Sequence, residues 1–167
     1  NVDFVISDLK SQAEHAKGLP IMITTSKSLI KAIRKELEPG FIVYVKNFDE
    51  AIEASNRLAP EHLQIMVKNP KKILKRITNA GAVFLGPYSP VSVGDYIAGP
   101  SHVLPTSGTA RFFSGLCVND FIKTTHVISY SKKSLENVRR SIEKLTSLEG
   151  LPRHADYIKV RFQEKKD

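Results

Sequence analysis

The strongest constraint on the fold of this 167-residue chain is a regular alternation of two sequence patterns. Short apolar runs rich in Ile, Val and Leu alternate with longer segments in which apolar residues recur every three or four positions. The first pattern is typical of buried strands, and the second is typical of helices that pack on them. Because strands that are apolar on both faces need cover on both sides, the alternation predicts an α/β fold with a mostly parallel sheet flanked by helices.

The alternation fills the first half of the chain. The predicted elements are a helix over 2–16, a strand over 21–24, a helix over 27–37, a strand over 41–45, a helix over 49–58, a strand over 62–67, a helix over 70–78 and a strand over 82–85.

The pattern changes after residue 85. Residues 86–108 are crowded with Gly, Pro and Ser but keep several Val, Ile, Leu and Tyr, so they predict a long ordered loop, and such loops usually carry function. The remaining predictions are a short helix over 119–123, a strand over 127–130, a helix over 132–148 that ends at Gly150 and Pro152, and a strand over 157–162.

Composition narrows the class of protein. A hydrophobic content of 41% excludes wholesale disorder, and no apolar run is long enough to cross a bilayer. No signal-peptide pattern opens the chain, so a soluble, intracellular and cytoplasmic protein without a membrane partner is expected. The single cysteine, Cys117, cannot form an internal disulfide and is interpreted as a small buried hydrophobic residue.

The net charge of +8 suggests nucleic-acid binding, because phosphate contacts need clustered Lys and Arg. Most of these basic residues, however, recur at helical spacing opposite apolar residues, as they do on a solvated helix face. No aromatic residues alternate with them to stack on bases. The sequence therefore predicts no nucleic-acid partner.

Five polar sites stand among residues that are poor core material. Their side chains offer the nitrogen and oxygen ligands that a divalent metal prefers and groups that move protons near neutral pH. The five are Gln12 with His15, Glu61 with His62, Asp95 with Tyr96, His102, and Glu149 with His154. Taken together, they indicate part of an enzyme.

Spacing alone leaves several of these sites open. Gln12 and His15 share one helix face and could converge on one metal ion, but an exposed polar face explains them better. Glu61 and His62 follow Pro60 at a strand entrance, where a pair of general bases and an ordinary turn are equally good readings. Glu149 and His154 flank a Gly-Leu-Pro turn that suggests helix termination.

The long loop gives a clearer functional signal. Asp95, Tyr96 and His102 lie among glycines and prolines that let the backbone approach a ligand closely and stiffen the segment. Asp95 could bind a metal, Tyr96 could orient a polar substrate, and His102 could accept a proton. The remaining histidine, His126, is predicted to be structural. No glycine fingerprint for a dinucleotide, no GxSxG elbow and no HExxH helix occurs within these residues.

Five segments together resemble histidinol dehydrogenase, and the likeness covers nearly the whole chain. They are residues 8–15 (DLKSQAEH), 58–63 (LAPEHL), 81–86 (GAVFLG), 89–96 (SPVSVGDY) and 98–110 (AGPSHVLPTSGTA). The resemblance implies a Rossmann-like α/β enzyme that oxidises L-histidinol through histidinal to L-histidine with two NAD molecules. These are the last steps of histidine biosynthesis.

The resemblance also implies a role for each site. His62 would accept the hydroxyl proton, Glu61 would activate the water that attacks the aldehyde, and an N/O ligand set without thiolate would bind a zinc that holds substrate. The implied zinc ligands are Gln12, His15, Asp95 and His154. The implied substrate contacts are His102, Glu149 and Tyr96, in addition to His62 and the four zinc ligands.

Two further expectations follow from the resemblance. Residues 1–116 would form part of the Rossmann-like domain with the zinc and the catalytic loop, and residues 117–167 would be an extension that completes the site of a partner subunit in a homodimer. Members of the family are longer and the chain begins without methionine, so it is expected to be a C-terminal part without the NAD-binding domain. A noncatalytic binding or assembly module remains the alternative, and Gln64, where relatives often carry an acid, has no assigned role.

Overall fold

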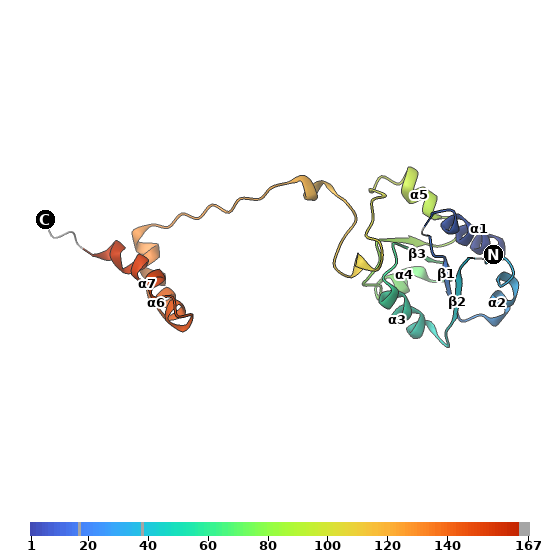
Figure 1. Cartoon of the computed structure of the whole chain (residues 1–167), viewed down its shortest axis with the longest axis horizontal. Coiled ribbons are helices and arrows are strands. Elements are labelled where there is room, and N and C mark those ends of the chain that lie inside the picture. The colour runs from blue at the N-terminus through green and yellow to red at the C-terminus, as the bar shows by residue number, and fades with distance from the viewer. Residues whose placement is uncertain (17, 38, 164–167) are drawn as a thin grey trace. The chain divides into compact units, whose positions relative to one another are not determined.

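The computed structural model of the chain describes residues 1–16, 18–37 and 39–163 (Figure 1). The chain divides into two compact units, residues 1–122 and residues 123–167. All of the strands among the described residues lie in the first unit, and each unit is considered by itself below.

The first unit begins with two helices and a pair of strands. They are α1 (Val2–Ala13), β1 (Ile21–Thr24), α2 (Lys27–Ile33) and β2 (Phe41–Tyr44). The strands run parallel, with Ile21 opposite Phe41 and Thr24 opposite Tyr44. Met22, Ile33 and Leu37 form the buried core here, and apolar residues of α1 pack against it.

The same pattern repeats in the next part of the chain. α3 (Phe48–Leu58), β3 (His62–Ile65), α4 (Pro70–Leu74) and β4 (Ala82–Leu85) form a second helix-and-strand set. Asn47 caps α3 by accepting a hydrogen bond from the Glu50 amide at 2.9 Å. β3 and β4 are parallel, and His62 lies opposite Ala82.

The predicted α/β class and the parallel pairing of strands are confirmed. In the described residues, however, the strands form two separate pairs, because each four-residue strand hydrogen-bonds only within its own pair. A Rossmann-like sheet is therefore not clearly shown. Three helices also end earlier than predicted, with α1 stopping at Ala13, α2 at Ile33 and α4 at Leu74.

The segment after β4 corrects one prediction. Residues 86–108 are not loop throughout, because they contain α5 (Val91–Tyr96), which begins directly after Pro90. Two 3₁₀ turns follow, η1 (Thr109–Arg111) and η2 (Val118–Phe121). The second of these replaces the short helix predicted over 119–123.

Two predictions for the region around residues 112–131 are wrong. No strand forms over residues 127–130 in the described structure, because these residues have no neighbouring strand to hydrogen-bond with, and Val127 is 89% exposed. Cys117 is exposed rather than buried, since the side chains on both sides of it are also exposed and no core forms around it.

The second unit is a helical pair. α6 (Lys132–Leu148) is confirmed over its predicted range, and Ser131 caps it by accepting a hydrogen bond from the Ser134 amide at 3.1 Å. The strand predicted over 157–162 is wrong, because α7 (Pro152–Lys159) and η3 (Val160–Phe162) occupy this range. Pro152 suits the first turn of a helix, and Ala155, the buried residue of α7, lies on its inner face.

Within the residues described, no helix is both long enough and apolar enough to cross a membrane.

Candidate functional site

One face of the β3–β4 pair carries the polar residues of the candidate site. Side chains alternate between the two faces of a strand, so His62 and Gln64 share a face, and their register partners Ala82 and Phe84 share it with them. α5 lies over this face, opposite the side on which α4 lies (Figure 1). The sequence places these residues on different elements, and the parallel pairing gathers them.

The structure brings together two predicted site residues from different elements, His62 and Asp95. Nε2 of His62 lies 3.7 Å from Oδ1 of Asp95, and the two side chains are 10% and 22% exposed. Both ring nitrogens of His62 are buried and lack a hydrogen-bond partner in the described part of the chain. Because 3.7 Å is too long for a hydrogen bond, both groups stay available to a third partner.

Glu61 is held beside His62 through its main chain. The Glu61 carbonyl accepts a hydrogen bond from the Ala82 amide at 2.8 Å, and the Pro60 carbonyl accepts one from the Gly81 amide at 2.9 Å. These bonds extend the β3–β4 ladder backwards. Ala59, fully buried and left-handed at φ 49°, turns the chain from α3 into this segment.

Gln12 and His15 lie at the end of α1. Gln12 is half-buried within the helix, whereas His15 is exposed just beyond its last residue. The chain then folds back on the helix, and the Gly18 amide donates a hydrogen bond to the His15 carbonyl at 2.8 Å. A Cβ at Gly18 would stand 2.0 Å from the Gln12 carbonyl oxygen, so only glycine allows this close approach.

Asp8 connects α1 to the face that carries His62. It lies one turn before Gln12, so these two side chains project from the same side of α1. Burial raises the pKa of Asp8, and the neighbouring Gln64 amide lowers it in part. The Gln64 amide nitrogen is buried and has no well-formed hydrogen bond within the described residues.

The other predicted site residues are more open. Tyr96 follows Asp95 but is 85% exposed, and His102 is exposed in the segment after α5. Glu149 and His154 are exposed on the second unit, at the end of α6 and within α7. Within the first unit the structure therefore gathers His62 and Asp95, whereas Tyr96 and His102 stay exposed.

The predicted zinc ligands fit the metal in their chemistry. Two imidazoles, a carboxylate and an amide form an N/O donor set, which is typical of a zinc ion that binds substrate. In geometry the fit is incomplete within the described residues. No group of three or more His, Cys, Asp or Glu side chains gathers there in a way that could hold a metal ion. His154 belongs to the second unit, so the first unit alone offers three of the four proposed ligands.

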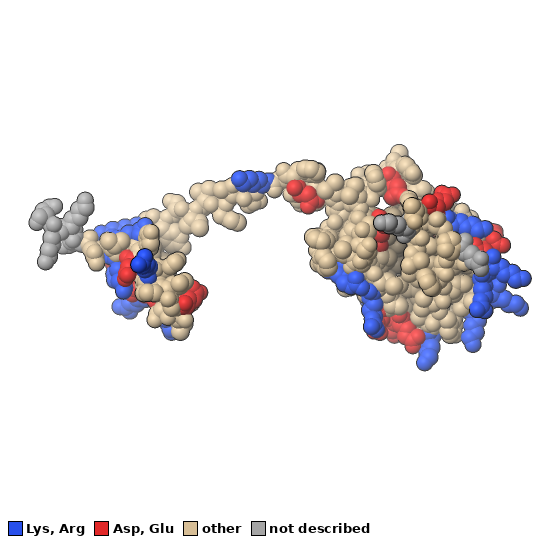
Figure 2. Space-filling view, in the orientation of Figure 1, with Lys and Arg blue, Asp and Glu red and all other residues tan. Residues whose placement is uncertain are grey.

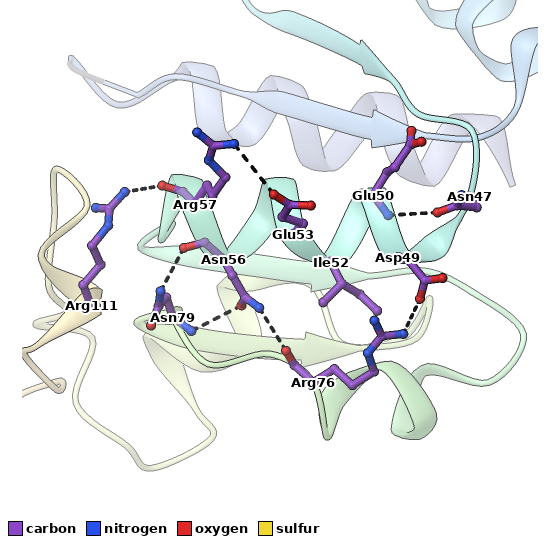
Figure 3. A pocket seen from close by; sticks show the side chains of 10 residues that line it. All are labelled: Asn47, Asp49, Glu50, Ile52, Glu53, Asn56, Arg57, Arg76, Asn79 and Arg111. Atoms are coloured by element: carbon purple, nitrogen blue, oxygen red, sulfur yellow. Dashed lines mark hydrogen bonds and ion pairs between the residues drawn. The ribbon is translucent and has the colours of Figure 1, made fainter.

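A separate hollow of the first unit lies away from these residues. An open groove of about 750 Å³ runs beside α3, and no predicted site residue lines it (Figure 3). Four of its charged side chains form ion pairs, since Arg76 contacts Asp49 at 2.6 Å and Arg57 contacts Glu53 at 3.7 Å. Lys and Arg are also distributed over both units with acidic residues among them (Figure 2).

Sequence reasoning missed the residue that organises this groove. The Asn56 side chain donates a hydrogen bond to the Arg76 carbonyl at 2.9 Å and accepts one from the Thr78 amide at 2.9 Å. Asn79 returns a bond from its side chain to the Asn56 carbonyl at 2.9 Å. No local sequence pattern predicts this role, because the hydrogen-bond partners of Asn56 follow α4 and are about twenty residues away in the sequence. Its contacts fasten the turn after α4 to α3, which is a structural function.

The comparisons with known proteins point in one direction. The family model described as histidinol dehydrogenase matches residues 1–162. The chain is 45% identical to histidinol dehydrogenase of Bacillus cereus over an alignment of 185 positions, with 99% of this chain and 43% of the relative covered. It is 47% identical to histidinol dehydrogenase of Caldanaerobacter subterraneus, with 95% of this chain and 41% of the relative covered.

A solved structure gives the same picture. The crystal structure of histidinol dehydrogenase from Elizabethkingia anophelis superposes with a TM-score of 0.87 at 35% identity. The match covers 96% of this chain and 41% of that chain. The chain thus spans about two fifths of the length of the relatives that it matches.

Proposed function

The chain belongs to the histidinol dehydrogenase family of histidine-biosynthesis oxidoreductases, and we propose that it supplies the proton-transfer and metal-binding part of a site that oxidises L-histidinol to L-histidine. The observation that supports the proposal best is the buried His62 imidazole, which has two unpartnered nitrogens and stands 3.7 Å from the Asp95 carboxylate. A buried histidine without a partner is poised to exchange a proton with a bound substrate.

His62 is the proposed base. In the first oxidation the substrate C–H bond breaks as hydride, and the hydroxyl proton passes to a nitrogen of His62 while the C–O bond becomes a carbonyl. In the second oxidation a water adds to that carbonyl, and its proton passes to the Glu61 carboxylate before the second hydride leaves. The main-chain bonds of Glu61 keep these two groups adjacent at the entrance of β3.

Two cofactors complete this proposal. Family members are generally zinc- and NAD-dependent, and NAD would take up the hydride at each step. Gln12, His15, Asp95 and His154 would hold the zinc, which would grip the substrate nitrogens and so orient the alcohol carbon. No residue of this chain is assigned to NAD.

The residues around His62 and Asp95 are proposed to orient the substrate. We assign His102 and Glu149 to polar contacts with histidinol, and Tyr96 to a position beside the Asp95 ligand. The exposure of Tyr96 and His102 is compatible with this role, because groups that contact substrate need to be reached from solvent.

The second unit is proposed to serve a second copy of the chain. Glu149 and His154 would complete the partner's site, which makes the active form a homodimer. Large apolar side chains exposed in the second unit support this proposal. Val127, before α6, is 89% exposed, Leu148 at the end of α6 is 76% exposed, and Tyr157 in α7 is 66% exposed. A cytoplasmic location is part of the same proposal, as for other biosynthetic enzymes.

The rival function is a noncatalytic binding or assembly module that keeps the family fold. Zinc analysis of the dialysed 167-residue chain and calorimetric titration with L-histidinol separate the two. We expect zinc and histidinol to bind, and both to be weakened in alanine variants at His15, Asp95 and His154. Unchanged metal content in all three variants would contradict the ligand assignment.

A turnover assay tests whether this chain, by itself, carries out the whole oxidation or only the proton-transfer and metal-binding part of it. We expect this chain alone to produce little or no NADH from histidinol and NAD, because the proposed groups move protons and hold metal but do not bind the hydride acceptor. Full NADH production by the chain alone would overturn that division.

A further inference from the structure

Phe84 lies at the centre of the face that carries His62. It is the residue of β4 opposite Gln64, and it is only 9% exposed. Its ring is tilted by 43° against the His62 imidazole, with 6.0 Å between the ring centroids. Because the Phe84 ring is buried and its side chain has only two rotatable bonds, it limits how the His62 imidazole can move.

The same ring contacts the helix that carries Asp95. A Cβ built on Gly94 would stand 2.6 Å from Cε1 and 2.8 Å from Cζ of Phe84, both closer than side chains tolerate. Glycine within a helix is ordinarily less stable than alanine. At this position the missing Cβ is what lets α5 rest on the ring, and the next residue is Asp95.

We propose that Phe84 and Gly94 act as a spacer that sets the separation between His62 and Asp95. The ring contacts the imidazole and the α5 backbone at once, so its size fixes both positions. At 3.7 Å the imidazole and the carboxylate do not hydrogen-bond to each other, and each keeps its free atoms for another partner. The two spacer residues are positioning residues, and the value of this spacing for catalysis rests on the proposed function.

Three variants test the spacer: Gly94→Ala, Phe84→Leu and the double variant. In Gly94→Ala the new Cβ meets the ring and displaces α5, so the melting temperature falls by several degrees despite the better helix propensity of alanine. Leucine has no atoms at the Cε1 and Cζ positions, so the double variant melts above Gly94→Ala. A Gly94→Ala chain that melts at or above the unmodified chain overturns the proposal.

Histidine reactivity separates positioning from mere packing. Diethyl pyrocarbonate modifies exposed imidazoles, and mass spectrometry resolves each site. Four of the five histidines are exposed and serve as internal references: His15, His102, His126 and His154. We expect the rate at His62 to rise severalfold in Phe84→Leu and to stay high in the double variant, although that variant recovers thermal stability. Recovery of both stability and His62 protection in the double variant would mean that the ring only packs, and would overturn the proposal.

Two controls keep this test independent of the others. Hydrogen exchange at the fully buried Ile33, in the separate β1–β2 core, reports whether a variant has loosened as a whole. Zinc and histidinol titrations of the unmodified chain report on the proposed function. Failure of those titrations leaves the His62 rates as a valid measure of the spacer, so the two proposals fail separately.

Discussion

His62 and Asp95 come from different elements, yet Nε2 of the imidazole lies 3.7 Å from Oδ1 of the carboxylate, and neither side chain is more than 22% exposed. β3 supplies the imidazole through the first residue of a strand, and α5 supplies the carboxylate. The proposed function gives the two groups different tasks, and four experiments test the arrangement and its supports.

Substitution of each partner alone distinguishes base from ligand. Asp95→Asn is expected to lower zinc affinity by more than about tenfold, since loss of even an outer partner of a metal ligand costs that much. His62→Asn is expected to leave zinc bound, because the imidazole is assigned to the substrate proton. Metal content after dialysis against a weak chelator measures both. Equal loss of zinc in the two variants would contradict the division of roles.

Gly18→Ala tests the turn that follows α1. The added Cβ would collide with the Gln12 carbonyl at 2.0 Å, so the end of the helix must shift. We expect a loss of about 1–3 kcal/mol in unfolding free energy, as for other overpacked sites, together with lower zinc content. Urea unfolding gives the first quantity. Gly115→Ala is the matched control, because its closest atom is the flexible end of Leu104 and little change is expected there.

Asn56→Ala tests the organiser of the α3 groove, shown between Arg76 and Asn79 in Figure 3. The change removes the donor to the Arg76 carbonyl and the acceptor for the Thr78 amide. A loss of about 0.5–1.5 kcal/mol is expected, because these exposed main-chain groups exchange a side-chain hydrogen bond for one with water. Chemical denaturation measures it. Histidinol and zinc binding should stay unchanged, and a selective loss of either would show that the groove belongs to the site.

Asp8→Asn tests the half-buried carboxyl beside Gln64. Burial raises the pKa of Asp8 in the folded chain, so the folded state holds its proton more tightly than the unfolded state does. Stability of the unmodified chain therefore falls as pH rises through the window between the two pKa values. We expect the variant to melt higher at neutral pH and the advantage to vanish in acid, where Asp8 is protonated. Thermal melts over a pH series measure this, and a less stable variant at neutral pH would refute it.

Local patterns predicted much of the secondary structure. The ranges 21–24, 82–85 and 132–148 coincide with β1, β4 and α6, because each combines a clear apolar period with a cap or a breaker at its ends. Predictions were wrong where an apolar run needed a neighbouring strand, because a local sequence pattern does not show whether one is present. Residues 127–130 have β-branched side chains but no strand beside them, and residues 157–162 continue a helix that Pro152 had started.

The sequence by itself determined the α/β class, the parallel helix-and-strand order and, through its motifs, the family and the candidate residues. Only the tertiary structure decided that His62 and Asp95 lie close together while Tyr96 stays in solvent, and that the Phe84 ring of β4 packs against both His62 of β3 and Gly94 of α5. The reason is physical: periodicity and capping act over one turn or one strand. A 3.7 Å approach between two elements depends on strand register, ring volume and the absence of a single Cβ, which no local pattern records.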